Sequence, residues 1–421
     1  MQKATTVCFA IAVAVLLAGA VCNRNADAPT TPELAGPDTG KCYDSLPFRA
    51  TSVDPQDDSV AYRFDWGDGK VSGWTGYKSS GTGCVAYHSW DTARVYRVKA
   101  QAIDFSGHTS AWSTERVVAI ESIPFTGYPD TIISSIAAGD DPFGLCVLPD
   151  GKYVYVACRG DGTVAVIRTQ DDSVIGSISI GGAAFTAASP DGRCVYVTDA
   201  GSNRVSIIRT STNQVETTVQ VGQSPLGIVV LPNGQFAYIC EGESDSVTCI
   251  RTSDNTVVAS VGVGAEPWYV ATLPNGKYIY VSCRGENAVY VIRTTDNMVT
   301  DTIRTPADPE GISVTPDGGR AYVTCGSGNV AVIQTVDNTV VDSVPVAGHP
   351  AGIGVLPNGQ YVYVSSYSGG FLSIIRTIDN VVVDSIPTDA YPDYYAFLPD
   401  GSRAYVVCRF DAGVKVIGRR H

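Results

Sequence analysis

Histidine, methionine and long apolar runs are scarce in this chain of 421 residues. There are four histidines and two methionines, and the longest unbroken apolar stretch runs only from Val7 to Ala20. A membrane-spanning helix needs about 20 apolar residues, so no segment is predicted to cross a bilayer. Lysine and arginine (29) are outnumbered by aspartate and glutamate (42). An acidic chain repels nucleic acids, so nucleic-acid binding is excluded. It also repels anionic lipid surfaces, so a lipid anchor is the one expected contact with a membrane.

The scarcity of histidine also limits the chemistry. His349 is the one histidine inside the C-terminal repeat region, because His421 is the last residue and His88 and His108 lie in the N-terminal part. A Ser-His-Asp arrangement or a histidine-based metal site therefore has little material. No catalytic residue, no metal site and no cofactor is assigned from the sequence.

Glycine (43) and proline (23) are abundant, and they mark an internal repeat. A Pro-Asp-Gly or Pro-Asn-Gly tripeptide, typical of a tight turn, recurs every 41 or 42 residues between an apolar stretch and a YVYV-like segment. Two further strand-like segments follow in each copy, which is the pattern of a four-stranded propeller blade. The tripeptides begin at Pro149, Pro190, Pro232, Pro274, Pro316, Pro357 and Pro399. The sequence predicts an all-β protein, a seven-bladed β-propeller over residues 130–421 preceded by a small β-sandwich.

The last repeat contains three strand segments, the third at 413–417. Residues 131–136 precede the first repeat and have the apolar character of a fourth strand. We expect them to pair with 413–417, because a closed ring leaves no open sheet edge.

The repeats resemble the YVTN family of β-propellers, whose tetrapeptide appears as Tyr-Val-Thr-Asp at 196–199 and as Tyr-Val-Thr-Cys at 322–325. The resemblance implies an exported, seven-bladed surface or periplasmic propeller and leaves the biochemical function open. The fourth position of the motif departs from the family's usual asparagine. Four repeats have cysteine there, and we expect these residues to be buried apolar side chains, too far apart for a disulfide or a shared metal. They are Cys158, Cys283, Cys325 and Cys408.

Residues 40–122 lack the repeat and resemble a PKD-type, immunoglobulin-like β-sandwich. The resemblance rests on Asp-Trp-Gly-Asp-Gly at 65–69, His-Ser-Trp at 88–90 and Tyr-Arg-Val at 96–98. Such modules act mostly as spacers or adhesion elements outside the cell. Asp65 and Asp68 are expected to bond the backbone of their own turn rather than to hold calcium. Cys42 and Cys84 are the two cysteines of this module, and we expect them to form a disulfide.

The first residues have the features of a secretory signal, with Lys3 ahead of the apolar run and a small-residue cleavage pattern at 18–20. We assign residues 1–22 to the signal and 23–39 to a polar linker. Cys22 resembles the lipidated cysteine of a bacterial lipoprotein. The alternative is cleavage after Ala20 with Cys22 as a free thiol.

One face of the predicted propeller varies from blade to blade. It carries the connections that enter the first strand of each blade, with Phe143, Phe185, Leu226, Trp268, Glu310, Ala351 and Asp393, and the connections that leave the second strand. Aromatic and arginine side chains often carry binding energy, so we predict a binding surface at the mouth of the central channel. The alternative is that these loops vary only because nothing constrains them, or that the arginines only pair with Glu241, Glu243 or Glu286. The predicted surface consists of Arg159, Trp268, Tyr269, Arg284, Tyr394 and Arg409.

The sequence thus predicts a non-catalytic recognition or scaffold protein that binds a protein, peptide or glycan at the cell envelope. The expected location is the periplasm, outer membrane or cell surface. Seven-bladed propellers also include lactonases and quinoprotein-like dehydrogenases. A hydrolase or dehydrogenase with its ligand in the central channel is the alternative.

Overall fold

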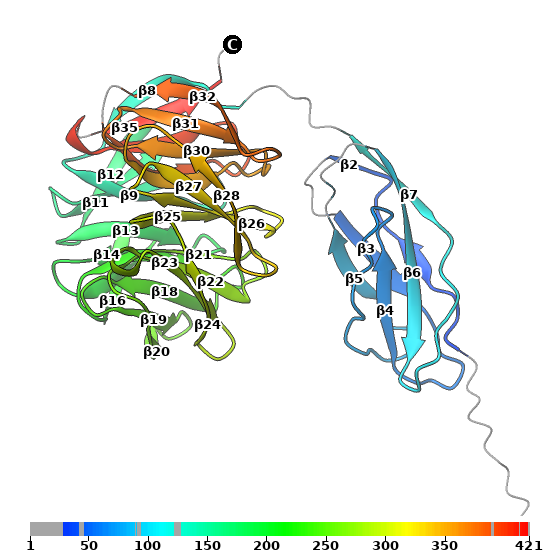
Figure 1. The fold of residues 1–421 in the computed structure, drawn as a ribbon. Helices are drawn as coiled ribbons and strands as arrows, with labels where there is room; N and C mark the ends of the chain where they lie inside the picture. Colours follow the sequence, from blue (N-terminus) through cyan, green and yellow to red (C-terminus); the bar gives the residue numbers. More distant parts are fainter. Residues whose placement is uncertain are drawn as a thin grey trace, which may run out of the picture. The chain divides into compact units, whose positions relative to one another are not determined.

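The computed structural model describes residues 28–41, 46–88, 90, 94–121, 128–388, 391–411 and 413–419. They belong to two compact units, Met1–Pro124 and Phe125–His421 (Figure 1). Apart from two short 3-10 turns, η1 (Arg284–Glu286) and η2 (Arg409–Asp411), the elements are strands, which confirms the predicted all-β class. In the described ranges no helix is long and apolar enough to cross a membrane.

The N-terminal unit is a sandwich of a three-stranded sheet, β1-β3-β5, and a four-stranded sheet, β2-β7-β6-β4. Buried aromatic residues, among them Phe48, Trp66 and Trp90, pack between the sheets. Asp65 and Asp68 each accept a hydrogen bond from the backbone two residues ahead, as expected. Strand pairing begins at β1, inside the stretch assigned to the linker. The strands are β1 (Glu33–Ala35), β2 (Thr39–Lys41), β3 (Leu46–Thr51), β4 (Val60–Asp65), β5 (Cys84–His88), β6 (Val95–Asp104) and β7 (Arg116–Glu121).

The C-terminal unit is a ring of seven four-stranded antiparallel sheets, here called blades 1 to 7. Blade 1 is β9 (Pro142–Val147), β10 (Tyr153–Cys158), β11 (Thr163–Arg168) and β12 (Ser173–Ser179); blade 2 is β13 (Ala183–Ala188), β14 (Cys194–Asp199), β15 (Arg204–Arg209) and β16 (Gln214–Gln220). Blade 3 is β17 (Pro225–Val230), β18 (Phe236–Glu241), β19 (Ser246–Arg251) and β20 (Thr256–Gly262); blade 4 is β21 (Pro267–Thr272), β22 (Tyr278–Cys283), β23 (Ala288–Arg293) and β24 (Met298–Arg304). Blade 5 is β25 (Pro309–Val314), β26 (Arg320–Cys325), β27 (Asn329–Gln334) and β28 (Thr339–Pro345); blade 6 is β29 (Pro350–Val355), β30 (Tyr361–Ser366), β31 (Phe371–Arg376) and β32 (Val381–Pro387).

The seventh blade combines both ends of the unit. It consists of β33 (Pro392–Phe397), β34 (Ala404–Cys408), β35 (Gly413–Gly418) and β8 (Thr131–Ala137), and β8 pairs antiparallel with β35. The first strands of neighbouring blades contact one another around the ring, and β33 contacts β9. The middle strands are apolar at nearly every position because neighbouring blades cover both of their faces.

Tyrosine hydroxyls tie neighbouring blades together. In blade 1, the Tyr155 hydroxyl donates to Asn213 Oδ1 of blade 2 at 2.6 Å. Asn213 has a φ of 52° in the turn between the third and fourth strands, a conformation that asparagine tolerates well. Five other junctions are closed in the same way, by Tyr238–Asn297, Tyr280–Asn338, Tyr322–Asn380, Tyr405–Asp172 and the bond from Tyr363 to the carbonyl of Pro129.

Candidate functional site

The third residue of each first strand determines how the centre of the ring is filled. In blade order these residues are Gly144, Phe185, Gly227, Tyr269, Gly311, Gly352 and Tyr394. The glycines permit close approach of neighbouring strands. A Cβ at Gly144 would lie 2.7 Å from Phe185 Cα, and one at Gly227 would lie 2.7 Å from Tyr269 Cα. Phe185 is therefore equivalent to Tyr269 and Tyr394, and its predicted alignment with Phe143 is wrong by one residue.

Aromatic rings from blades that are not neighbours meet at this centre. Tyr269 and Tyr394 stack at a centroid distance of 5.3 Å, and Phe185 packs edge-on against both. The indole N–H of Trp268 donates to the Tyr394 hydroxyl at 2.7 Å. Tyr394 is buried and Trp268 is half-buried. These side chains form an aromatic plug, so Tyr269 and Tyr394 fill the channel rather than present a free surface.

Two of the predicted arginines are held by acids from other parts of the ring. Arg284 Nε lies 2.7 Å from Asp308 Oδ1, and its Nη2 lies 3.3 Å from Glu310 Oε1. The guanidinium also stacks over the Trp268 ring at 4.5 Å. These partners differ from the alternative set of Glu241, Glu243 and Glu286, because the acids of the following blade lie closer.

Arg409 is held in the same way. Its Nε lies 2.9 Å from Asp141 Oδ1, and its Nη1 lies 3.9 Å from Asp393 Oδ2. It also covers the ring of Phe143 at 4.7 Å. Arg159, which is exposed, stands 5.7 Å above the same ring. The three predicted arginines thus surround the plug, and Arg159 is the one most open to solvent.

Two carboxyl groups beside the plug are almost completely buried. Burial raises the pKa of Asp393 to about 7, with Glu310 and Asp141 adding to the shift and Arg409 opposing it. Burial also raises the pKa of Glu310, against the opposing effect of Arg284. His349 Nε2 lies 3.6 Å from Asp308 Oδ2 on the solvent side of this group. Carboxyl groups therefore outnumber the arginines that neutralise them.

Two exposed aromatic residues and one half-buried tyrosine form a group at the rim that was not predicted from the sequence. Tyr391 is 46% exposed and Phe410 is 67% exposed, and their rings lie 4.9 Å apart. Tyr367 packs 5.4 Å from Tyr391 and contacts the Arg409 guanidinium at 5.9 Å. We call Tyr367, Tyr391 and Phe410 the rim cluster. The sequence contained a signal for this cluster. Tyr391 and Phe410 lie in the same kinds of variable connection as the residues of the predicted binding surface.

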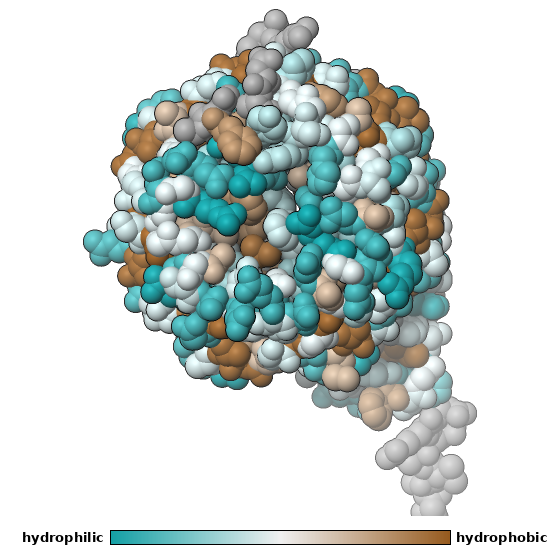
Figure 2. Space-filling view, turned by 60° about the vertical axis from the view of Figure 1, so that its left-hand side comes forward, coloured by the Kyte–Doolittle hydropathy of each residue, from teal (hydrophilic) through white to brown (hydrophobic). Residues whose placement is uncertain are grey.

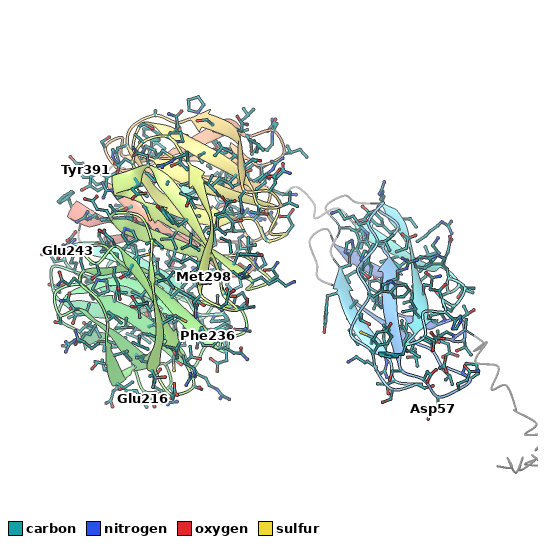
Figure 3. All side chains as sticks on the ribbon, turned by 60° about the horizontal axis from the view of Figure 1, so that its bottom comes forward. Asp57, Glu216, Phe236, Glu243, Met298 and Tyr391 are labelled. Carbon is teal, nitrogen blue, oxygen red and sulfur yellow. The ribbon has the colours of Figure 1, made fainter. Side chains whose placement is uncertain are left out.

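The figures show this end of the propeller. Figure 3 places Tyr391 and Glu243, which lie in the two kinds of variable connection, on the same side of the propeller. Figure 2 brings that side forward and shows hydrophilic residues crowding the middle of the face around a depression. The site therefore combines a buried aromatic floor, a ring of charged groups and an exposed aromatic rim.

A separate cleft of about 600 Å³ lies among the Pro-Asp-Gly and Pro-Asn-Gly turns of blades 2 and 3, on the opposite face. Cys194, which begins β14, is among its lining residues, and the other six blades have Tyr, Phe or Arg at the equivalent position. Among the described residues, the Tyr196 hydroxyl makes no bond to Asn255, and the buried Asn255 Oδ1 has no partner. Within the described part of the propeller, this is the one blade junction without the tyrosine bond.

The remaining cysteine predictions fall into two groups. Cys22 and Cys42 lie outside the described residues, so lipidation and the Cys42–Cys84 disulfide stay predictions; Cys84 itself is buried. The four repeat cysteines are fully buried. Burial raises the pKa of Cys158 to about 11 and that of Cys283 to about 12, so these thiols are poor nucleophiles.

The fold and the ring closure define the C-terminal unit as a seven-bladed β-propeller. A model of the family described as "Lactonase, 7-bladed beta-propeller" matches residues 182–342, which span blades 2 to 5. Among solved structures, the chain is similar to the hydrazine synthase of Kuenenia stuttgartiensis, with 22% identity and a TM-score of 0.62 over 67% of this chain and 96% of that one. No curated protein matches the chain. The structural similarity shows a shared propeller fold.

Proposed function

We propose that the propeller is a non-catalytic recognition module that binds a partner protein or peptide on the channel face. The observation that carries this proposal is the rim cluster. Tyr391 and Phe410 leave large aromatic surfaces in solvent, and Tyr367 of the same cluster contacts Arg409. Aromatic and arginine side chains are enriched at the energetic centres of protein interfaces. Arg409 is already held by Asp141, so little side-chain entropy remains to be lost when it meets a partner.

The proposal is tested with the purified mature protein, an envelope extract and a glycan panel. A partner captured by the wild type is then titrated against the Tyr391→Ala, Phe410→Ala double variant. We expect its affinity to fall by about 1–4 kcal/mol in total. Ile378→Ala is the matched control, because Ile378 is 83% exposed in a turn on the opposite face.

Two results would contradict the proposal. One is unchanged affinity of the double variant, and the other is an equal loss with Ile378→Ala. If the protein binds the glycan panel and no protein from the extract, the ligand is a carbohydrate rather than a protein or peptide. Arg284 is a poor choice for such a test, because its removal leaves the buried Glu310 without its cation.

The proposed setting is the cell envelope. The signal-like residues 1–22, the PKD-like N-terminal unit and the YVTN-like repeats support export. Cys22 would carry a lipid if the signal is of the lipoprotein type. Mass spectrometry of the mature N-terminus distinguishes a lipidated Cys22 from cleavage after Ala20.

A lactone hydrolase is the second candidate function, favoured by the match of blades 2 to 5 to the lactonase family model. Glu310 and His349 would be the groups available for proton transfer, beside the guanidinium of Arg284. Release of acid from a panel of lactones, lost in Glu310→Gln, would favour hydrolysis over simple recognition.

A further inference from the structure

Three side chains with metal-binding atoms meet at the edge of the channel face. Asp308 and Glu310 flank the start of β25 in blade 5, and His349 directly precedes β29 in blade 6. One ligand atom from each lies within 4.8 Å of the other two. The sequence alone predicts no metal site here, because His349 is the one histidine of the repeats. The ring brings two carboxylates of the preceding blade beside His349, and this contact has no signal in the sequence.

A glycine lies directly against two of these ligand atoms, where any side chain would clash with them. Gly326 follows β26, and a Cβ built on it would lie 2.5 Å from Asp308 Oδ2 and 2.7 Å from His349 Nε2. Most other blades have a larger residue at the equivalent position, namely Arg159, Ala200, Arg284, Tyr367 and Arg409, whereas blade 3 has Gly242.

The surrounding charges favour a cation. Arg284 engages Oδ1 of Asp308 at 2.7 Å and only weakly approaches Oδ2, at 3.4 Å. Oδ2 is therefore directed toward His349. Glu310 is buried, and its nearest cation is the Arg284 guanidinium at 3.3 Å. Nearby, Asp393 is also buried, with a single ion pair at 3.9 Å. A divalent ion would offset this local excess of negative charge.

We propose that Asp308, Glu310 and His349 bind a divalent first-row transition-metal ion, with its remaining positions open to water or a ligand. One imidazole and two carboxylates suit Mn²⁺, Fe²⁺ or Zn²⁺, whereas Ca²⁺ prefers oxygen ligands only. Arg284 acts as a positioning residue that orients Asp308 from outside the ligand set. The inference goes beyond the proposed function, because metal binding is measured without any partner.

The test uses Mn²⁺ with the untagged mature protein. Mn²⁺ is chosen because thiols bind it poorly, so the cysteines do not compete. Loss of the free Mn²⁺ signal in electron paramagnetic resonance gives the stoichiometry and Kd, and pulsed measurements report a coordinated histidine nitrogen. We expect one strong site per chain with nitrogen coupling, and no displacement by an equal concentration of Ca²⁺.

Two variants locate the site. Gly326→Ala places a methyl group against Asp308 Oδ2 and His349 Nε2 without removing a ligand, and His349→Ala removes the nitrogen. We expect each to weaken Mn²⁺ binding about 10-fold or more. Gly242→Ala, the equivalent change in blade 3, should bind as the wild type does.

Three results would overturn the assignment. They are the absence of a single strong site in the wild type, a wild-type spectrum without nitrogen coupling, and wild-type affinity in both Gly326→Ala and His349→Ala. Circular dichroism shows whether each variant is folded. If a variant is not folded, the wild-type spectrum still tests the proposal, because it reports the stoichiometry and the nitrogen ligand directly.

Discussion

The tyrosine bonds between blades give a stability prediction with an internal control. Tyr238→Phe removes the hydroxyl that donates to Asn297 Oδ1 at 2.7 Å and leaves this acceptor without its partner. Tyr196→Phe is chemically the same change, but in the structure its hydroxyl closes no junction. The first change should therefore destabilise the propeller and the second should not.

The expected size follows from the burial of the bond. Leaving a buried acceptor unpaired costs roughly 1–3 kcal/mol. Asn297 is half-buried, and water can replace part of the bond, so the lower end, about 1 kcal/mol, applies to Tyr238→Phe. This corresponds to a fall in Tm of roughly 1.5–2 °C for a unit of this size. Tyr196→Phe should stay within about 0.5 kcal/mol of the wild type.

Differential scanning calorimetry of the mature chain gives the Tm of the propeller in both variants. The propeller transition is read directly where it is separate from that of the N-terminal unit. Where they overlap, urea unfolding monitored by near-ultraviolet circular dichroism gives the same comparison. Equal losses in the two variants would refute the reasoning, because they would mean that the junction of blades 2 and 3 is bonded in solution like the other six.

Three further predictions follow from the channel and the N-terminal unit. The pKa of Asp393 is raised to about 7, so the folded chain retains a proton that the unfolded chain releases near pH 4. Stability should then fall by up to about 4 kcal/mol as pH rises from 4 to 7 and level off above it, and Asp393→Asn, melted in EDTA at pH 5 and 8, should lose this dependence. Gly352→Ala should cost about 1–3 kcal/mol, because a Cβ there meets the backbone of blade 7, whereas Gly176→Ala, with no atom within 4 Å, should be neutral by urea denaturation. Peptide mapping without reduction should find Cys42 joined to Cys84, and an alkylated Cys84 thiol would contradict the bridge.

The propeller was predictable because its repeat is regular and local. Turn tripeptides at a constant interval specify where strands end, and apolar segments between them specify strands covered on both faces. The topology of a blade then places the variable connections on one face whatever their residues are. Arg159, Trp268, Arg284 and Arg409 could therefore be placed at the same end of the channel from sequence alone.

The direction of individual side chains could not be predicted in the same way. Five of the first strands after β9 begin with proline, which aligns them with Pro142, whereas β13 begins with Ala183. Phe185 was misplaced by one residue, although the turn tripeptides carry the register, since Phe143 lies six residues before Pro149 and Ala184 lies six before Pro190. One residue in a strand reverses the side-chain direction. The partners of the arginines were missed for a different reason. Asp308 and Asp141 belong to the following blade, and contacts across blades have no sequence signal.

The number of blades itself accounts for the polar sector of the channel face. Glycine and aromatic residues alternate at the third position of the first strands, and an odd number of positions cannot alternate all the way round. The break falls at blades 5 and 6, where Gly311 and Gly352 are consecutive. Neither can be replaced by an aromatic residue, because a Cβ at Gly311 would lie 2.6 Å from the Ala351 carbonyl oxygen, and one at Gly352 would meet Asp393. The rings of the aromatic plug therefore come from blades 2, 4 and 7. Between blades 5 and 6, the polar side chains of Asp308, Glu310 and His349 lie at the channel instead. A repeat that differs so little from blade to blade thus acquires one chemically distinct side, and that side is where we expect the metal ion.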